Sequence, residues 1–484
     1  MASSATIEAD VAVVGAGAAG LYAALTAAEA GGRVALVSAT PLAQSASYWA
    51  QGGLAAALAV DDTREQHLED TLRAGRGTVR RSAAEILTSE APAGVRDLER
   101  LGVHFDADRR GRLSLGLEGG HSVRRIVHAG GASTGRRVTR QLSALVAEHP
   151  RIDVLEDCRA VGLPTTAGRC DGVRLHDGRT VSARAVVLAT GGAAALWSRT
   201  TNPAGAVGAG MILAHAAGAA LADLEMMQFH PTAVAGANGA DGFLVTEAVR
   251  GEGALLVDAA GERFVDELAP RDEVALAVAR RMRDTGAASV GLDMRAVDPA
   301  LFPNVVAVLR RSGIDPVREL VPVAPAAHYT MGGIATDLEG RASIPGLYAV
   351  GECACTGLHG ANRLASNSLS ECFVFGRRAG LAALAEPLPV GSPEPGPGLP
   401  RPELSPASRE ALWQHAGIER DADGLRVLLD DPHPLVRLVG ACALAREESR
   451  GAHLRRDFPQ RDAALDEHHT VVRVSDAPVL EHWA

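Results

Sequence analysis

The sequence predicts an α/β fold with a Rossmann-like nucleotide-binding domain, an inserted second domain and a small helical domain at the C-terminal end. Three observations carry this prediction. A short apolar run near the start of the chain is followed by a glycine-rich turn and a helix-like stretch. Two later apolar runs also end in glycine. A proline-rich segment precedes a helical pattern in the last part of the chain.

The first element is a βαβ unit. Val11–Val14 is a continuous apolar run, as expected for a parallel strand buried on both faces. Gly15–Gly20 has the pattern GxGxxG, and a helix-like stretch continues to about Gly31. Arg33–Val37 then predicts the second strand. In this context the glycines let backbone N–H groups approach a pyrophosphate at the N-terminus of the helix, so we predict a dinucleotide site.

Two later strands have the same form as the first. Ala185–Thr190 ends in Gly191-Gly192, and Gly346–Val350 ends in Gly351-Glu352. In an open α/β sheet, ligands bind in the crevice at the carboxyl ends of the strands. We therefore expect the three strands to share one sheet and their terminal residues to line one crevice.

The other segments differ in composition. Residues 224–329 are rich in His, Arg, Glu and Pro and are predicted to form the inserted domain. Residues 387–406 hold eight prolines and three glycines in twenty positions, which favours an extended linker. Residues 407–456 show helical periodicity, and residues 407–484 are predicted to form the helical domain. The nucleotide-binding domain then comprises residues 1–223 and 330–386.

Composition excludes several classes of function. The chain has 484 residues, 47% of them apolar, which suits a large core. Its net charge of −10 and its 3% aromatic content argue against binding to nucleic acid. All 48 basic residues are arginine. Pyridoxal enzymes and Walker P-loops both need a lysine, so both are excluded.

The cysteines and the N-terminal segment indicate in which cellular compartment the protein is found. The six cysteines form no CxxC pair and no metal-ligand spacing, so neither a disulfide scaffold nor a metal site is predicted. Met1–Asp10 has no basic segment of the kind that signal peptides carry. Residues 11–28 are uncharged, but their regularly spaced glycines favour a strand and a helix over a membrane span. We therefore expect a cytoplasmic protein without a membrane segment.

The details of the nucleotide site favour FAD over NAD. The acidic ribose ligand usual at the end of the second strand is replaced by Ser38, whose hydroxyl can still bind a ribose. Glu352 places a carboxylate at a strand end, where it can bind a ribose hydroxyl. Gln51–Gly53 lets backbone approach a ring system, and Asn367–Leu369 opens a predicted helix that presents N–H donors to a flavin carbonyl. The predicted cofactor-binding residues are Gly15, Ala16, Gly17, Ala18, Ala19, Gly20, Ser38, Ser47, Gln51, Gly52, Gly53, Glu352, Asn367, Ser368 and Leu369.

Longer motifs resemble a known family. Gly15–Gly20, Ala50–Gly53, His328–Gly333 and Gly357–Ser368 resemble the succinate dehydrogenase/fumarate reductase flavoprotein superfamily. This resemblance implies a Rossmann-like FAD-binding domain, an inserted α+β capping domain and a C-terminal helical domain.

Other motifs are most similar to one branch of this superfamily, whose members oxidise L-aspartate. They are Glu118–Ser122, Gln228–Thr232 and Glu267–Asp272, and Glu448–His453 extends the resemblance into the C-terminal region. The resemblance implies FAD-dependent oxidation of L-aspartate to iminoaspartate, with oxygen reduced to hydrogen peroxide or fumarate reduced to succinate. This reaction is the first step of de novo NAD biosynthesis, and the product would pass to quinolinate synthase, which leads to quinolinate.

Two other functions stay open from the sequence. One is a soluble flavoprotein subunit of fumarate reductase or succinate dehydrogenase. The other is a non-catalytic FAD-binding or scaffold protein, which would be expected to have lost the charged residues of the substrate site. Every such position is filled in this chain.

The chain departs from the superfamily pattern at two positions. Membrane succinate dehydrogenases attach FAD to a His a few residues before the Gln-Gly-Gly motif, and the aligned position here is Ala46. We therefore expect non-covalent FAD. Many relatives have Gly-Asp-Gly where this chain has Gly208-Ala209-Gly210, which removes one carboxylate from the flavin side.

A dicarboxylate substrate needs cations, and the matched motifs supply them. Arg363 suits a bidentate clamp on one carboxylate. The resemblance also places His230 and His328 on the substrate carboxylates. Thr246 can add a hydroxyl donor, and Gln228 and Ser366 are weaker contacts of the same site.

Proton transfer is assigned by resemblance to Arg271. A guanidinium is normally always charged, so a base role requires a neighbour to which it can pass its proton. Glu247 and Arg250 lie three residues apart, on one face if the segment is helical, and the resemblance joins them to Arg271 as a relay. Abstraction of a C3 proton with hydride loss at C2 and direct dehydrogenation of the C–N bond both remain open.

Glu118 is predicted to tell aspartate from succinate. The two ligands differ by one ammonium group, which needs a negative or strongly accepting partner. Glu118 lies in a glycine-flanked loop, and succinate dehydrogenases typically place a neutral Gln there.

Overall fold

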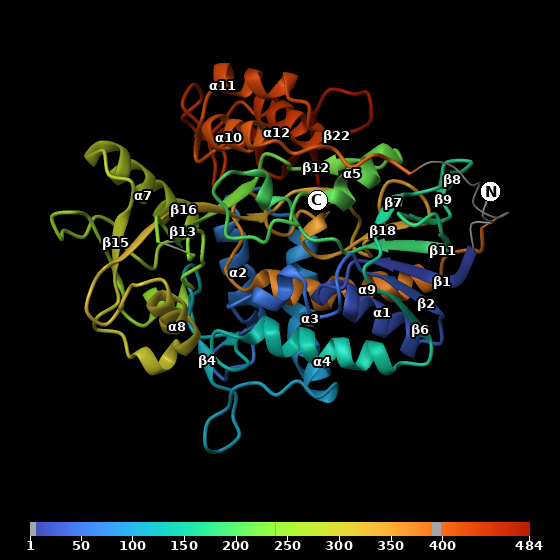
Figure 1. The fold of residues 1–484 in the computed structure, drawn as a ribbon, viewed down its shortest axis with the longest axis horizontal. Helices are drawn as coiled ribbons and strands as arrows, with labels where there is room; N and C mark the ends of the chain where they lie inside the picture. The colour runs from blue at the N-terminus through green and yellow to red at the C-terminus, as the bar shows by residue number, and fades with distance from the viewer. Residues whose placement is uncertain (1–5, 238, 390–397) are drawn as a thin grey trace.

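The computed structural model describes residues 6–237, 239–389 and 398–484 (Figure 1). Most of the predicted linker, residues 390–397, lies outside the described residues. Within the described ranges, no helix is both long and apolar enough to cross a membrane.

One seven-stranded sheet forms the base of the nucleotide-binding region. Strand β1 lies between β2 and β11 and is parallel to both, and β18 pairs in parallel with β11. The three apolar runs therefore share one sheet, as predicted, and their glycines lie at the same edge. The strand order is β6(Ile152–Leu155)-β2(Val34–Val37)-β1(Thr6–Val14)-β11(Thr180–Leu188)-β10(Gly172–Leu175)-β7(Ala160–Gly162), with β18(Leu347–Ala349) on β11.

Helices cover one face of this sheet. Helix α1 (Ala18–Glu29) packs on α9 (Asn367–Leu384), where the rings of Tyr22 and Phe373 meet edge to face with centroids 5.2 Å apart. The small residues of α1 are almost all buried, which lets the two helices approach closely. The other helices of this region are α2(Arg64–Ala74), α3(Arg81–Arg100), α4(Thr134–Glu148) and α5(Ala209–Ala216).

A separate four-stranded sheet lies in the predicted inserted domain, at the left of Figure 1. Strands β13 and β16 form its long antiparallel pair, and their register places Gln228 opposite Tyr329. A distinct apolar core, which includes Leu256, Val278 and Leu292, lies between this sheet and its helices. The elements are β13(Met227–Val234), β16(Val321–Thr330), β15(Val290–Asp293), β14(Leu255–Val257), α6(Ala248–Gly251), α7(Arg271–Thr285) and α8(Pro303–Arg311).

The C-terminal region is helical only in its first part. Helices α10 (Pro406–His415), α11 (Ala422–Val427) and α12 (Pro434–Ala445) match the predicted periodicity. The chain then forms a hairpin of β22 (His468–Val472) and β23 (Val479–His482), and β22 pairs with β12 (Leu221–Ala222). The prediction of a helical domain over 407–484 therefore omits a hairpin, which extends a sheet of the nucleotide-binding region rather than standing alone.

The smaller sheets connect these regions. They are β19(Ala354–Cys355)-β17(Gly333–Ala335)-β12-β22-β23, β3(Leu54–Ala55)-β5(Ile126–Val127)-β4(Leu115–Gly116), β20(Glu419–Arg420)-β21(Leu454–Arg455) and β8(Thr165–Thr166)-β9(Arg169–Cys170).

Candidate active site

The glycine-rich turn after β1 is shaped for close approach of backbone. Gly15 has φ +112°, a conformation that favours glycine, and a Cβ there would overlap the carbonyl oxygen of Ala189. A Cβ at Gly20 would overlap the carbonyl oxygen of Gly15. Gly17 is the N-cap of α1, so the free N–H groups of the first helical turn face the crevice edge of the sheet. This geometry suits a pyrophosphate.

The loop that contains Ser47 contacts the first turn of α1, directly after the glycine-rich turn. The η1 segment (Ala46–Trp49) places the Ser47 hydroxyl 3.1 Å from the backbone N of Ala18, from which it accepts a hydrogen bond. The predicted ribose ligand Ser38 is buried, and its hydroxyl donates to the carbonyl of Thr40 over 2.6 Å. A ribose would therefore compete with a local hydrogen bond at Ser38.

The start of α9 joins the nucleotide crevice to the substrate side. Ser366, with φ 61°, caps this helix, and its hydroxyl accepts from the backbone N of Gly53 at 3.2 Å. The side chain of Asn367 faces α2, where it bonds His67 and Thr71. Only the backbone at Asn367 can therefore serve a flavin.

The crevice also holds buried polar atoms without a protein partner. Among the described residues these include the side-chain oxygens of Gln51 and Thr190. Thr190 follows β11, and beyond it Gly191 has open space where a Cβ would point. Buried polar groups rarely stay unpaired, so these atoms fit a polar ligand of the size of FAD.

Glu352 lies just after β18 and is half-buried. Its carboxylate accepts from the backbone N of Thr330 at 2.9 Å. Burial raises the pKa of Glu352 to about 7. The carboxyl group is therefore close to half-protonated at neutral pH. It can accept a hydrogen bond from a ribose hydroxyl when ionised and donate one to it when protonated.

The predicted substrate residues converge from both domains. Gln228 on β13 accepts from Arg271 Nη1 at 3.0 Å and from Arg363 Nε at 3.1 Å, both at its Oε1 atom. Arg363 comes from the loop before α9, and Arg271 is the first residue of α7. Burial and the nearby charge of Arg271 lower the pKa of Arg363 to about 10. Two buried cations on one neutral oxygen form a site that an anion would stabilise.

Two histidines lie beside the buried arginines. His230 on β13 and His328 on β16 lie with ring centroids 5.0 Å apart. His328 Nδ1 is 2.7 Å from the hydroxyl of Thr201, and His230 Nδ1 accepts from the backbone N of Thr232 at 3.2 Å. Burial and the neighbouring guanidinium groups hold the pKa of both rings well below the usual range. Both rings are therefore neutral hydrogen-bonding groups in the absence of an anion.

The predicted relay is assembled as a buried chain. Arg271 Nε donates to Glu247 Oε2 at 2.7 Å, and Arg250 Nη2 lies 3.2 Å from Glu247 Oε1. Burial alone would raise the pKa of Glu247, but Arg271 and Arg250 together lower it. Burial lowers the pKa of Arg250. Thr246, directly before Glu247, is buried at the same place.

Glu118 lies between the predicted substrate residues and the cofactor crevice, next to Ser366. Its carboxylate is buried and accepts from the Ser366 hydroxyl at 2.6 Å. A Cβ at Gly52 would lie 3.6 Å from the nearer carboxylate oxygen, so Glu118 borders the Gln-Gly-Gly loop of the cofactor crevice. Its charge also stabilises the charged forms of Arg250 and Arg363.

Comparison with known proteins decides the family. The FAD binding domain family matches residues 10–369, and the fumarate reductase flavoprotein C-terminal family matches residues 429–482. The L-aspartate oxidase of Streptomyces coelicolor is 44% identical over 97% of this chain and 92% of its own length. The L-aspartate oxidase of Caulobacter vibrioides is 48% identical over 93% of each chain.

The chain belongs to the L-aspartate oxidase family.

A solved structure of E. coli quinol fumarate reductase superposes with a TM-score of 0.88 at 28% identity, covering 98% of this chain and 96% of that one. The predicted fold class and the FAD cofactor are thereby confirmed: this L-aspartate oxidase family member is an FAD-binding oxidoreductase of the succinate dehydrogenase/fumarate reductase superfamily.

Some residues of this family member's site were not predicted. Arg363 lies over the ring of Tyr329, with its Cζ 4.2 Å from the centroid, and Tyr329 donates to Glu371 at 3.0 Å. Tyr329 directly follows His328 in a quoted motif, so its position gave a signal. Thr201 supports His328 from a distant loop, and no pattern in the sequence points to it.

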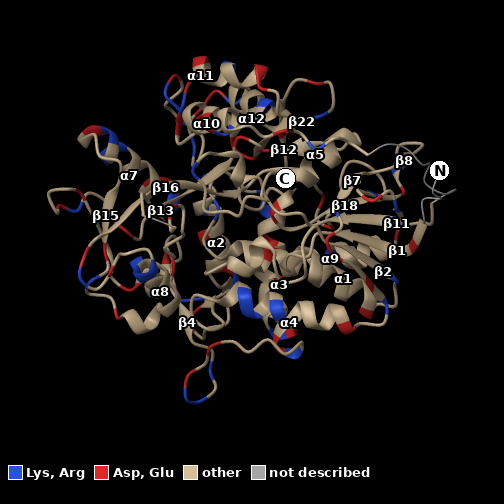
Figure 2. Ribbon diagram, in the orientation of Figure 1, with Lys and Arg blue, Asp and Glu red and all other residues tan. Residues whose placement is uncertain are grey.

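Two further groups carry no assigned chemistry. Asp223, Cys355 and His469 bring potential metal ligands within 4.8 Å, but His469 Nδ1 and Asp223 Oδ2 are 2.5 Å apart, a hydrogen-bond distance. Burial holds the pKa of the Cys355 thiol well above its usual range, which disfavours a thiolate ligand. The loop of residues 106–114 projects below β4 with basic and acidic positions side by side (Figure 2), as in the ion pair of Arg112 with Asp108.

Proposed function

We propose that the protein oxidises L-aspartate to iminoaspartate with FAD, using oxygen, which gives hydrogen peroxide, or fumarate, which gives succinate. The observation that carries this proposal is the convergence of Arg271 and Arg363 on Gln228 Oε1. A dicarboxylate is the small ligand that best neutralises this excess of positive charge, because its carboxylates accept charge-assisted hydrogen bonds from guanidinium groups. Family membership supports aspartate as that dicarboxylate.

The residues would divide the chemistry as follows. Arg363, His230 and His328 bind and orient the carboxylates, with Thr246 and Ser366 adding hydroxyl groups. Glu118 accepts from the substrate ammonium. When bound, FAD supplies the two-electron acceptor.

Arg271 takes the substrate proton, and the relay lets it do so. Glu247 Oε2 already accepts from Arg271 Nε, so the charged Arg271 can first give this proton through Glu247 toward Arg250, which leaves Arg271 neutral and able to take the substrate proton. The lowered pKa of Arg250 favours release of that proton at the far end. Both C3 proton abstraction and C–N dehydrogenation are compatible with this arrangement.

A side-by-side assay tests the function. The holoenzyme is mixed in air with L-aspartate or with succinate, and hydrogen peroxide is measured. We expect peroxide with aspartate and little or none with succinate. Oxidation of succinate alone would contradict the proposal and favour a fumarate reductase or succinate dehydrogenase flavoprotein.

Acid precipitation tests how the cofactor is attached. Ala46 offers no nucleophile at the position of the covalent link, so FAD should stay in the supernatant. Flavin retained in the washed pellet would contradict non-covalent binding.

The domain roles and the cellular setting belong to the same proposal. Residues 224–329 act as a capping domain on the FAD-binding residues 1–223 and 330–386. Residues 407–484 pack against both of these domains and stabilise them. The protein works in the cytoplasm, at the first step of de novo NAD biosynthesis. It passes iminoaspartate to quinolinate synthase, and a coupled assay with both enzymes, supplied with the three-carbon co-substrate that the pyridine ring requires, should give quinolinate without a lag.

A further inference from the structure

Helix α7 carries the proton-transfer residue at its first position and is ion-paired to other parts of the chain near both ends. Arg271 begins the helix, and Asp272 and Glu273 follow in its first turn. The N-terminal pairs reach the FAD-binding region and the C-terminal pairs reach the C-terminal domain. None of the partner residues belongs to the substrate site described above.

At the N-terminal end the partner is Arg76. Its Nε and Nη2 atoms donate to the two oxygens of Asp272 at 2.8 and 3.0 Å, and Nη2 also donates to Glu273 at 2.6 Å. The Asp272 side chain is only 8% exposed. Burial alone would lower the pKa of Arg76, but the two carboxylates raise it, so the guanidinium stays charged. A bidentate pair of this kind fixes direction as well as distance.

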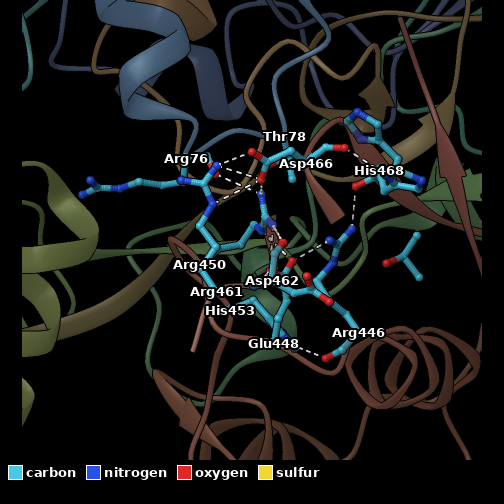
Figure 3. A network of polar contacts seen from close by, with 12 residues as sticks. Arg76, Thr78, Arg446, Glu448, Arg450, His453, Arg461, Asp462, Asp466 and His468 are labelled. Carbon is cyan, nitrogen blue, oxygen red and sulfur yellow. Dashed lines mark hydrogen bonds and ion pairs between the residues drawn. The ribbon is translucent and has the colours of Figure 1, made fainter. Parts of the chain in front are cut away.

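Arg76 is itself held in place by the C-terminal domain. Its carbonyl accepts from Arg450 Nη1 at 3.0 Å, and Arg450 is fully buried against Glu448 (Figure 3). The next carbonyl, that of Gly77, accepts from the backbone N of Glu467 at 2.8 Å. In Figure 3 the Arg76 side chain extends out of this polar network. Arg76 has φ 58°, a left-handed conformation that an arginine keeps only where its surroundings impose it.

The same loop also touches the substrate-binding loop. The carbonyl of Ala74 accepts from Asn362 Nδ2 at 3.1 Å, and that of Gly75 accepts from the backbone N of Ala361 at 3.1 Å. Arg363 directly follows Asn362 in the chain. The loop at Arg76 therefore contacts the segments that present both substrate arginines.

At the other end of α7 the partner is Glu419. Arg280 Nη2 lies 3.0 Å from one of its oxygens and Arg283 Nη1 lies 2.5 Å from the other. Burial alone would raise the pKa of Glu419, but the two arginines lower it. Arg280 and Arg283 are more than half exposed, so salt screens this end more than the Arg76 end.

We propose that Arg76 and Glu419 are positioning residues that hold α7 against the other two domains and thereby keep Arg271 on Glu247 and Gln228. This inference deepens the proposed function, on which it rests. Arg76 contributes more, because its pairs are bidentate, less exposed and one residue away from Arg271.

The test compares Arg76→Ala, Arg76→Lys and Glu419→Gln holoenzymes with the wild type. Arg81→Ala is the matched control, because Arg81 is an exposed arginine that pairs within its own helix with Glu85. The limiting rate of flavin reduction by aspartate, the KM and the Tm are measured at low and high salt.

Arg76→Ala should lower the limiting rate about 10–100-fold, since a misplacement of about 1 Å costs about that much, with little change in Tm. Arg76→Lys should recover only part of the rate, because an ammonium cannot bind both oxygens in a fork. Glu419→Gln should cost about two- to threefold at low salt and nothing at high salt. Arg81→Ala should match the wild type. A wild-type limiting rate in Arg76→Ala, with or without a lower Tm, would overturn the proposal.

Hydrogen exchange separates this proposal from the function on which it rests. Arg76→Ala should speed exchange of the amides of residues 271–285 and leave those of residues 134–148 unchanged. If the wild type does not oxidise aspartate, the proposed function fails, and unchanged exchange in α7 would independently overturn the positioning role.

Discussion

The cofactor crevice and the substrate site lie side by side but are built in different ways. The crevice is made of backbone at the ends of three parallel strands, and its contacts depend on residues that lack a side chain, such as Gly15 and Gly20. The substrate site is made of charged side chains that come from β13, α6, α7 and the loops before α9 and at Glu118. A crevice of the first kind tolerates little added volume, whereas a site of the second kind tolerates little loss of charge.

The charges of the substrate site also explain its pKa shifts. Arg271, Arg250 and Arg363 are buried with Glu247 and Glu118, so within this group positive charge exceeds negative charge by one. Burial and this excess together lower the pKa of Arg363 and of both histidines. A bound dicarboxylate would reverse these shifts. In the crevice, by contrast, the pKa of Glu352 is raised mainly by burial.

The largest effect is expected at the centre of the substrate site. Arg271→Leu should keep the flavin spectrum and lower the rate of flavin reduction by aspartate about 10²–10⁴-fold, because it removes the proton acceptor. Glu247 keeps Arg250 as a partner, so the fold should survive. Stopped-flow absorbance measures the rate, and Arg281→Leu on the same helix is the control. Near-normal reduction in Arg271→Leu would remove this residue from the mechanism.

Glu118→Gln should change specificity more than stability. A charge-assisted hydrogen bond is worth about 1.5–3 kcal/mol, so aspartate affinity should fall about 10–150-fold. Succinate affinity should stay the same or rise, because a carboxylate near the ligand is neutralised. The Ser366 hydroxyl can still donate to the amide oxygen that the substitution leaves in place of a carboxylate oxygen. Flavin difference titrations with both ligands measure this, and an equal loss for the two would show that Glu118 is structural.

Gly20→Ala tests the crevice by adding volume. The new Cβ would overlap the carbonyl of Gly15, and overpacking of this kind costs about 1–3 kcal/mol. We expect lower FAD occupancy and a lower Tm, measured by absorbance ratio and thermal melting. Gly94→Ala in α3 is the control, since its nearest neighbour would be the Phe373 Cβ at 3.7 Å. Full occupancy in Gly20→Ala would show that the turn can relax.

The smallest effect is expected for Glu352→Gln in the flavin-free protein. The pKa of Glu352 is about 7 in the folded state, against an ordinary value of 4.5. The folded state therefore binds more protons between these values, and stability falls as pH rises through this window. The variant removes this loss, so its Tm should exceed that of the wild type by about 2–4 °C at pH 8 and equal it below pH 4.5. A pH-independent difference would show that the carboxylate is not buried in the neutral form.

Much of the crevice could be predicted because its signals are local. The run Val11–Val14 with Gly15–Gly20 specifies a strand, a turn and a helix within a few residues, and these are β1 and α1. Ser38 and Asn367 show the limit of such reasoning. Their residue types suited a ligand, but the hydroxyl of Ser38 bonds the carbonyl of Thr40 and the amide of Asn367 bonds helix α2.

The proposed substrate residues rest on family resemblance, because their spacing along the chain does not group them. Arg271 and Arg363 are 92 positions apart, and the packing of the four-stranded sheet against the nucleotide-binding region brings both to Gln228. Thr201 and Arg76 were not found, because each acts through a contact with a distant segment and neither sits in a recurring pattern.

Local sequence patterns were enough to place the first βαβ unit and its glycine turn, and composition alone showed that arginine supplies the basic side chains. These follow from the periodicity of apolar residues and from backbone sterics, which act between near neighbours. The packing of distant segments sets which cations share one oxygen, which carboxylates are buried and which ion pairs form at the two ends of α7. The reason is that electrostatic interactions depend on distance and on exclusion of water, and both are properties of segments brought together by packing.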